Sequence, residues 1–387
     1  MPLTLGSERL LASGRLKGQR IGVVSNPASV DSNLGHIVDR LASYPGARLT
    51  AIFGPQHGFR SDVQDNMIET AHTEDEMRRV PVYSLYSDTR KPTAAMLRNV
   101  DVLVIDLQDV GVRIYTYIYT MANCLIAARA HGVKVVVCDR PNPIGGVKIG
   151  GPMLRSGYES FVGQFPIPLR HGMTIGELAR FFNEACGIGA DLKVVAMEGW
   201  KRPMHFDETG LPWVMPSPNI PTLDTAIVYS GTVLFEGTNI SEGRGTTRPF
   251  ELIGAPWVNP ESLADKLAAY RLPGVHFRPA VFEPTFQKHA KTSCGGCQVH
   301  VLDRNAFKAV ESAVAVLAEI RAQNMSQFQW RQPPYEYEQV KLPFDILAGS
   351  CELRQQVEAG LPARTIYYGW EADHERFAKT RAPFLLY

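Results

Sequence analysis

The chain contains 387 residues, of which 45% are hydrophobic and 20% are charged, as in an ordinary globular protein. This composition excludes disordered and fibrous proteins, and the length is sufficient for two domains. Lys and Arg together number 40 against 39 Asp and Glu, for a formal net charge of +1. Such a balance gives no electrostatic reason to expect a nucleic-acid partner.

No stretch of the sequence approaches the roughly 18 consecutive apolar residues of a membrane span, so we expect no membrane partner. The segment Met1–Leu11 lacks the basic and apolar regions of a secretory signal. The six cysteines do not form the pattern of a disulfide framework, and we expect reduced thiols and a cytoplasmic protein. Cys294 and Cys297 form the closest pair, without a second pair at the spacing of a zinc site.

Short apolar runs in the first part of the chain are typical of parallel strands that are buried on both faces. They are Arg20–Ser25, Arg48–Phe53, Val80–Leu85, Val102–Leu107 and Lys134–Asp139, with a further run at Leu192–Met197. Helical spacing is found at His36–Ser43, Thr93–Asn99, Met121–Ala130 and Thr174–Ala185. This alternation predicts an α/β fold with a Rossmann-like, doubly wound parallel sheet.

The pattern changes after about residue 230. Strands are expected at Val275–Phe277 and Gln298–Leu302, and a long amphipathic helix at Ala306–Ala322. A Pro-rich segment, Trp330–Pro343, follows. We therefore predict a Rossmann-like N-terminal domain over residues 1–230. A smaller α+β C-terminal domain over residues 231–387 would close the cleft of the active site.

Polar clusters follow three of the predicted strands, at the edge where an open parallel sheet binds ligands. They are Gly54–Arg60, Asp106–Tyr119 and Asp139–Pro143. Their candidate catalytic residues are His57, Asp106 and Asp109. Their candidate substrate-binding residues are Gln56, Arg60, Gln108, Arg113, Tyr115, Tyr117 and Asn142.

Each of these candidates also has a purely structural interpretation. His57 would then be a turn residue, the two aspartates would cap the next helix, and Arg113 would form an internal ion pair. The tyrosines would be packing residues with satisfied hydroxyl groups. Asp139 and Arg140 would form an ion pair at the end of a strand. The sequence leaves these alternatives open.

A second polar group lies at the expected domain junction, in Leu234–Thr247. Glu236 and Glu242 are candidate catalytic carboxylates there, and Asn239 and Arg244 are candidate binding residues. The structural alternative is an ordinary Gly-rich hairpin. No Lys-Ser/Thr ending supports a P-loop, and no Gly-x-Gly-x-x-Gly follows the first strand. No His-x-His or His-Glu-x-x-His spacing indicates a metal site.

Longer motifs carry a resemblance to a known family. They are Gly54–Arg60, Pro81–Tyr86, Asp106–Tyr117, Asp139–Pro143, Arg170–Leu178, Pro216–Thr222, Phe235–Thr247, Pro249–Glu251, Gly254–Trp257, Pro334–Glu338 and Pro343–Leu347. With these motifs the chain resembles, over residues 20–387, the DUF1343 family of NamZ-type exo-β-N-acetylmuramidases. The resemblance implies a Rossmann-like domain, a distinct C-terminal domain and a site between them. It also implies release of N-acetylmuramic acid from the non-reducing end of peptidoglycan-derived glycans, in cell-wall turnover, without a metal or organic cofactor.

One position departs from the family pattern. Where the family typically shows Pro-Glu-His-Gly, this chain has Gln56 between Pro55 and His57. An amide cannot exchange a proton near neutral pH, so another carboxyl group must act or the chemistry must differ. Hydrolysis of another amino sugar, or muropeptide binding without catalysis, are the alternative functions.

Two requirements of the implied reaction select among the candidates. Glycoside hydrolysis usually needs one protonated and one ionised carboxyl group. In the alternative route, the N-acetyl group of the substrate itself attacks the anomeric carbon, and Gln56 would be compatible with that route. Recognition of the lactyl carboxylate of muramic acid calls for a cation, and Arg60, Arg113 and Arg244 are the arginines in the matched motifs.

Overall fold

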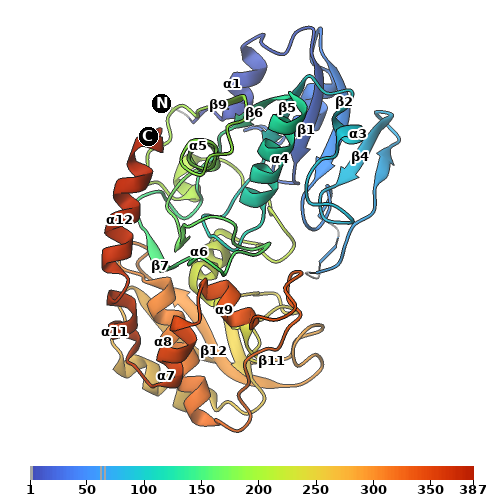
Figure 1. Cartoon of the computed structure of the whole chain (residues 1–387). Helices are drawn as coiled ribbons and strands as arrows, with labels where there is room; N and C mark the ends of the chain where they lie inside the picture. The colour runs from blue at the N-terminus through green and yellow to red at the C-terminus, as the bar shows by residue number, and fades with distance from the viewer. Residues whose placement is uncertain (1–2, 62, 65–66) are drawn as a thin grey trace.

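A computed structural model of the protein describes residues 3–61, 63–64 and 67–387. Its N-terminal part is built on a seven-stranded sheet with the order β3-β4-β2-β1-β5-β6-β9 (Figure 1). The strands are β1 (Arg20–Ser25), β2 (Arg48–Gly54), β3 (Thr73–Asp75), β4 (Val80–Ser84), β5 (Val102–Asp106), β6 (Lys134–Cys138) and β9 (Leu192–Val195). All neighbours are parallel except the edge pair β3 and β4. Without β3, the order is that of a Rossmann fold, as predicted.

Helices cover both faces of this sheet because the side chains of its strands alternate between two cores. Ile21 and Val23 of β1 pack in one core with α1 (Gly6–Ala12) and α2 (Ile37–Ala42). Val24 faces the other core, which contains α3 (Ala94–Leu97), α4 (Tyr117–His131) and α5 (Ile175–Glu184). Burial on both faces explains why the strands appear in the sequence as continuous apolar runs.

The predicted strands and helices of this part are present, with one notable difference in length. Helix α4 begins at Tyr117, four residues before the predicted start at Met121. Two short strands, β7 (Gly150–Met153) and β8 (Pro168–Arg170), form a separate antiparallel pair that was not predicted. They lie in the long connection between β6 and α5.

The second sheet is antiparallel, with the order β10-β12-β11. Its strands are β10 (Leu252–Ala255), β11 (Val275–Phe282) and β12 (Cys294–Val301), and it packs with α6 (Leu223–Thr232), α7 (Pro260–Ala269) and α8 (Ala309–Gln323). Gly295 and Gly296 have no room for a Cβ, which would lie 2.1 and 2.0 Å from backbone oxygens. Cys294 and Cys297 are buried free thiols, and burial raises their pKa values to about 11 and 12.

The end of the chain ties the two parts together. After α9 (Pro343–Ala348), α10 (Glu352–Glu358) and α11 (Ala363–Tyr368), helix α12 (Glu371–Arg381) runs from the lower part back to the upper one (Figure 1). Asp373 on this helix pairs with Arg155 at 2.7 Å. The Tyr387 hydroxyl donates to Asp139 at 2.7 Å, beside β6. Among the described residues, no helix has the length and apolarity to cross a bilayer.

Candidate active site

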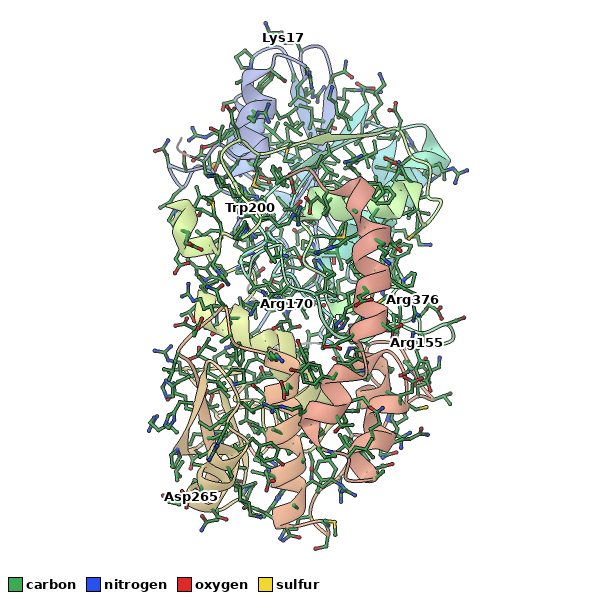
Figure 2. The ribbon with its side chains drawn as sticks, turned by 90° about the vertical axis from the view of Figure 1, so that its left-hand side faces the viewer. Lys17, Arg155, Arg170, Trp200, Asp265 and Arg376 are labelled. Atoms are coloured by element: carbon green, nitrogen blue, oxygen red, sulfur yellow. The ribbon has the colours of Figure 1, made fainter. Side chains whose placement is uncertain are left out.

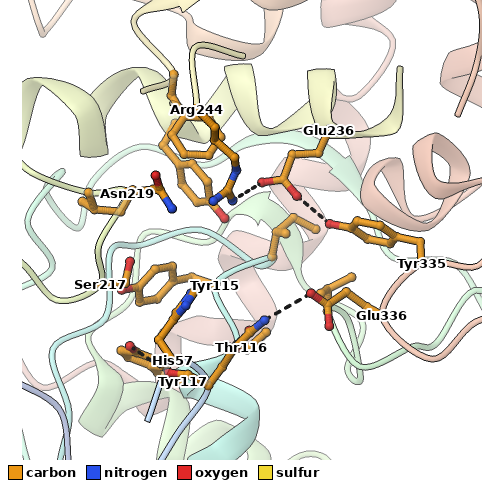
Figure 3. A pocket seen from close by; sticks show the side chains of 16 residues that line it. His57, Tyr115, Thr116, Tyr117, Ser217, Asn219, Glu236, Arg244, Tyr335 and Glu336 are labelled. Carbon is orange, nitrogen blue, oxygen red and sulfur yellow. Dashed lines mark hydrogen bonds and ion pairs between the residues drawn. The ribbon is translucent and has the colours of Figure 1, made fainter. Parts of the chain in front are cut away.

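A pocket between the two parts of the molecule collects polar side chains from distant segments (Figure 3). The loop after β2, the segment between β5 and α4, and the loop before α6 line it from the N-terminal side. The segment following α6 and the Pro-rich segment close it from the other side. Its lining consists of Gln56, His57, Ile114, Tyr115, Thr116, Tyr117, Val162, Ser217, Asn219, Ile220, Tyr229, Glu236, Arg244, Phe250, Tyr335 and Glu336.

Glu336 is presented to this pocket by a tight turn. Tyr335 and Glu338 exchange both backbone hydrogen bonds at 2.9 Å, so Glu336 and Tyr337 are the two central residues of a hairpin turn. Both have positive φ angles, 45° and 71°, as a type I′ turn requires. Asn or Gly usually occupies such positions, and a bulky residue there is strained by about 1–3 kcal/mol. Strain of this size is typical of functional sites.

The surroundings of Glu336 favour its protonated form. The side chain is buried, and its oxygens accept hydrogen bonds from Tyr86 Oη at 2.9 Å and Gln56 Nε2 at 3.1 Å. Burial raises the pKa of Glu336 to about 7, although these two hydrogen bonds lower it in part. Near neutral pH, this carboxyl group therefore retains a proton in a substantial fraction of the molecules.

Glu236 has the opposite character. It lies in the short 3₁₀ helix η2 (Val233–Gly237), and its oxygens accept from Arg244 Nη2 and Tyr335 Oη, both at 2.7 Å. Burial by itself would raise the pKa of Glu236, but the ion pair with Arg244 and the hydrogen bonds hold it below its usual range. The negative charge of Glu236 also contributes to the raised pKa of Glu336. The pocket thus contains one readily protonated and one firmly ionised carboxyl group.

Arg244 is held beside Glu236 with part of its guanidinium group unused. Its Nε lies 3.4 Å from Glu242 Oε1, and Lys288 Nζ also donates to Glu242, at 2.7 Å. The guanidinium carbon lies 5.0 Å from the centre of the Phe250 ring. Arg244 Nη1 is buried and has no hydrogen-bond partner among the described residues. This nitrogen therefore has unused hydrogen-bonding capacity.

Aromatic rings form much of the remaining wall. The rings of Tyr115 and Tyr117 meet edge to face at 4.7 Å, and Tyr229 meets Phe250 in the same way at 4.7 Å. Tyr117 Oη donates to the carbonyl of Pro216 at 3.0 Å, which fixes the loop that carries Ser217 and Asn219. Rigid aromatic walls with a few polar groups are typical of sites for small ligands.

Six of the predicted site residues line this pocket: Gln56, His57, Tyr115, Tyr117, Glu236 and Arg244. The two predicted aspartates lie outside its lining. Asp106 forms a buried ion pair with Arg140, with oxygen–nitrogen distances of 2.6 and 2.9 Å. Asp109 accepts from the Gly111 amide at 2.8 Å and lies 3.5 Å from His171. Both therefore support the strand ends behind the pocket.

The other predicted binding residues also lie outside the lining. Arg113 is fully buried and donates to the carbonyls of Pro152, Ile167 and Leu347 at 2.7–2.9 Å. Gln108, Asn142 and Asn239 likewise donate to backbone carbonyls, those of Pro141, Met173 and Gln327 among them. Arg60 lines a separate hollow beside β4. Glu242, predicted as a catalytic carboxylate, also lies outside the lining of the pocket, because it is paired with Arg244 and Lys288.

Six polar residues of the lining were not predicted from the sequence as site residues: Glu336, Tyr335, Thr116, Ser217, Asn219 and Tyr229. Two of the motifs that carry the resemblance, Pro334–Glu338 and Pro216–Thr222, contain four of them. A carboxylate between two tyrosines in the first motif was the available signal. Because this motif lies far along the chain from the Rossmann strands, the sequence did not show that it reaches the same site. Among the described residues, no group of three or more His, Cys, Asp or Glu side chains could hold a metal ion.

Comparison with known proteins places the chain in a family. The family descriptions "Exo-beta-N-acetylmuramidase NamZ, N-terminal" and "Exo-beta-N-acetylmuramidase NamZ, C-terminal" match residues 21–224 and 227–387. The chain belongs to the NamZ exo-β-N-acetylmuramidase family. The resemblance found in the sequence motifs is thereby confirmed.

Relatives of known sequence and structure agree with this placement. The chain is 50% identical over 373 residues to the peptidoglycan beta-N-acetylmuramidase NamZ of Bacillus subtilis, covering 96% of this chain and 88% of that protein. Two DUF1343 family proteins of Bacteroides fragilis have similar crystal structures. Their TM-scores are 0.88 and 0.76, at 36% and 29% identity, and each match covers 100% of this chain and 99% of the other.

Proposed function

We propose that the protein is an exo-acting β-N-acetylmuramidase that releases N-acetylmuramic acid from the non-reducing end of peptidoglycan fragments during cell-wall turnover. The observation that carries this proposal is the pair Glu336 and Glu236, whose pKa values are shifted in opposite directions within one pocket. Two carboxyl groups whose pKa values differ in this way provide the protonated and the ionised group that glycoside hydrolysis needs. The name of the Bacillus subtilis relative supports the choice of sugar.

In this proposal Glu336 is the general acid. Its proton passes to the glycosidic oxygen as the bond from that oxygen to the anomeric carbon breaks. The water that supplies the new hydroxyl group gives up its proton to the Glu336 carboxylate, which restores the acid. Glu236 stays ionised and stabilises the positive charge that develops on the sugar ring. Gln56 holds Glu336 in position through its amide nitrogen, 3.1 Å from Oε1. An amide at this position is thus compatible with catalysis, because it orients the acid without exchanging a proton.

Arg244 is the proposed anchor for the lactyl carboxylate of muramic acid. Of the three arginines in the matched motifs, it lines the pocket, and its buried Nη1 lacks a partner among the described residues. The guanidinium group of Arg113 is instead committed to backbone carbonyls. Because a buried charge–charge contact is strong and directional, Arg244 would favour muramic acid over N-acetylglucosamine.

The proposal includes a division into two domains near residues 230 and 231, with the catalytic pocket between them. Residues on both sides of this division line the pocket.

We also propose a cytoplasmic location. The six free cysteines support it, since unpaired thiols are usual in reducing compartments. Fractionation of cells with an antibody to the protein tests the location.

The decisive experiment measures release of nitrophenol from the β-nitrophenyl glycoside of N-acetylmuramic acid, with the N-acetylglucosamine glycoside alongside. We expect cleavage of the first and little or none of the second. Cleavage of both at similar rates would replace the proposal by a hydrolase of broader amino-sugar specificity. Binding of N-acetylmuramic acid without turnover of either glycoside would make the protein a muropeptide-binding protein.

A further inference from the structure

A second cavity lies on another side of the junction between the two parts of the molecule. Its volume is about 200 Å³, and its walls come from β7, β8, α6, α11 and the start of α8. Arg170, at the end of β8, lines it. Figure 2 shows this residue in the middle of the molecule, where the upper and lower parts meet. None of the residues lining this cavity belongs to the catalytic pocket.

Three cationic side chains line this cavity. Lys148 donates to the carbonyls of Arg304 at 3.0 Å, of Phe307 at 3.2 Å and of Asn305, all of which are neutral groups. Arg170 is 92% buried and donates through Nη2 to the carbonyl of Ile144. Its Nε is buried without a hydrogen-bond partner in the described part of the chain. Lys308 reaches the rim, where Nζ donates to Tyr368 Oη at 2.9 Å.

The start of helix α8 adds a fourth source of positive potential. Residues 305–310 line the cavity, and α8 begins at Ala309 and continues for 15 residues. Lys308 occupies the N-cap position, and no side chain caps the helix. The first amides of an uncapped helix lack intrahelical acceptors, and the helix dipole places partial positive charge there. Helix starts of this kind bind phosphate and similar anions.

Two acidic groups lie near these cations. Glu311, in the first turn of α8, lies 3.8 Å from Lys308 Nζ and 3.5 Å from Arg364 Nε, so it is shared between two cations. Asp303 also attracts Lys148 electrostatically. Burial, followed by repulsion from Arg170 and Lys308, lowers the pKa of Lys148 to about 8. Lys148 is therefore repelled by the other two cations of this cavity, and a bound anion would relieve that repulsion.

We propose that this cavity binds a phosphate group through Arg170, Lys308 and the first amides of α8. The donors approach from different elements, which suits a tetrahedral oxyanion better than a planar carboxylate. The group is either inorganic phosphate or the phosphate of a small ester. Ser230 lines this cavity, whereas the preceding residue of α6, Tyr229, lines the catalytic pocket. Helix α6 therefore contacts both sites, although phosphate binding does not depend on the proposed muramidase activity.

Calorimetric titration of the full chain tests the proposal, with inorganic phosphate and glucose 6-phosphate as probes at constant ionic strength. We expect saturable binding with one site per chain. Lys308→Met should weaken it by about tenfold, the effect of losing one charge-assisted hydrogen bond. Lys308 is partly exposed, so we expect this variant to keep the fold, with circular dichroism as the check. Arg170→Met should weaken binding further, with circular dichroism as the check of its folding.

The matched control is Lys193→Met, which removes an exposed lysine on β9 outside this cavity and should bind phosphate like the unmodified protein. Tighter binding of inorganic phosphate would identify the free anion as the ligand, and tighter binding of glucose 6-phosphate would identify an ester. Absence of saturable binding to the unmodified protein would overturn the proposal. Equal affinity in Lys308→Met, Lys193→Met and folded Arg170→Met would also overturn it.

Discussion

Gln56 Nε2 donates a hydrogen bond of 3.1 Å to Glu336 Oε1, between residues 280 positions apart in the chain. The same Gln56 side chain accepts from Thr116 Oγ1 at 2.8 Å, so its orientation is fixed from both ends. The residue that departs from the family pattern is thus in direct contact with the carboxyl group best suited to act as an acid.

Replacing Glu336 with Gln should remove the general acid while preserving the shape of the side chain. We expect kcat/KM for a muramic acid disaccharide to fall by at least about 100-fold. The loss should be smaller for the nitrophenyl glycoside, because nitrophenolate leaves without being protonated. Steady-state kinetics on both substrates measure this difference. Glu371→Gln, at an exposed position of α12, is the matched control and should leave both rates unchanged. Equal losses on the two substrates would argue against the role as acid.

The pH dependence should reflect both carboxyl groups. Glu336 must be protonated to act, and its pKa of about 7 predicts that kcat/KM declines as the pH rises through about 7. Glu236 must be ionised, and because its pKa is held below the usual range, activity should persist well into mildly acidic solution. Rates on a muramic acid disaccharide between about pH 4 and 9 test this profile, because its leaving group needs the proton of Glu336. Activity that rises between pH 6 and 8 would contradict the assignment of Glu336.

Gln56→Glu should move the alkaline limb of this profile. The new carboxylate would lie beside Glu336, and two carboxyl groups in contact hold a shared proton to higher pH. It also replaces the amide donor that lowers the pKa of Glu336. We therefore expect the decline in kcat/KM to begin above pH 7. Gln56→Ala, which removes the donor without adding a charge, should cause a smaller shift in the same direction. An unchanged alkaline limb in both variants would show that another group controls it.

Arg244→Met should abolish the preference for muramic acid over N-acetylglucosamine. KM for the muramic acid glycoside should rise, because the cation that meets the lactyl carboxylate is gone. The variant also removes the ion pair that lowers the pKa of Glu236, so the acid limb should move to higher pH. Rates on both glycosides across the pH range separate the two effects. Arg60→Met, outside the pocket, is the control. If this variant, and not Arg244→Met, loses the preference for muramic acid, then Arg60 is the residue that binds the lactyl carboxylate.

Arg113→Met should affect stability. The guanidinium group donates to three buried carbonyls, and leaving acceptors buried without partners costs about 1–3 kcal/mol each. We expect the free energy of unfolding to fall by about 3 kcal/mol or more in urea denaturation. Arg15→Met removes an exposed arginine and should change it by less than about 0.5 kcal/mol. A fully stable Arg113→Met variant would mean that water or a rearranged side chain satisfies these carbonyls.

Local sequence patterns were sufficient for the six parallel strands of the sheet, but not for its short edge strand β3. The run Val102–Leu107 identifies β5 because each of its side chains is buried in one of the two cores, whichever way it points. The strand order then brings the segments after β2 and β5 to one edge. Gln56, Tyr115 and Tyr117 were selected as candidates by this reasoning, and the structure places all three in the pocket.

The same reasoning could not separate the aspartates behind the pocket from the carboxylates within it. Asp106 follows a strand just as a catalytic residue would, but Arg140, from the end of the neighbouring strand, neutralises it. That pairing depends on how β5 and β6 lie side by side. The end of a predicted strand therefore indicates which residues lie at the edge of the sheet. The neighbouring strand of the same chain decides which of those side chains are neutralised and which can still contact a ligand.

By itself, the sequence determined the Rossmann-like sheet, the family and several lining residues, because burial periodicity and motifs are local properties of the chain. Only the tertiary structure decided the protonation states. It brought Glu336 from a strained turn near the end of the chain to Gln56 and Tyr86, and it set Glu236 beside Arg244. The pKa of a carboxyl group depends on its burial and on charges contributed by distant segments, and these exist only once the chain is folded.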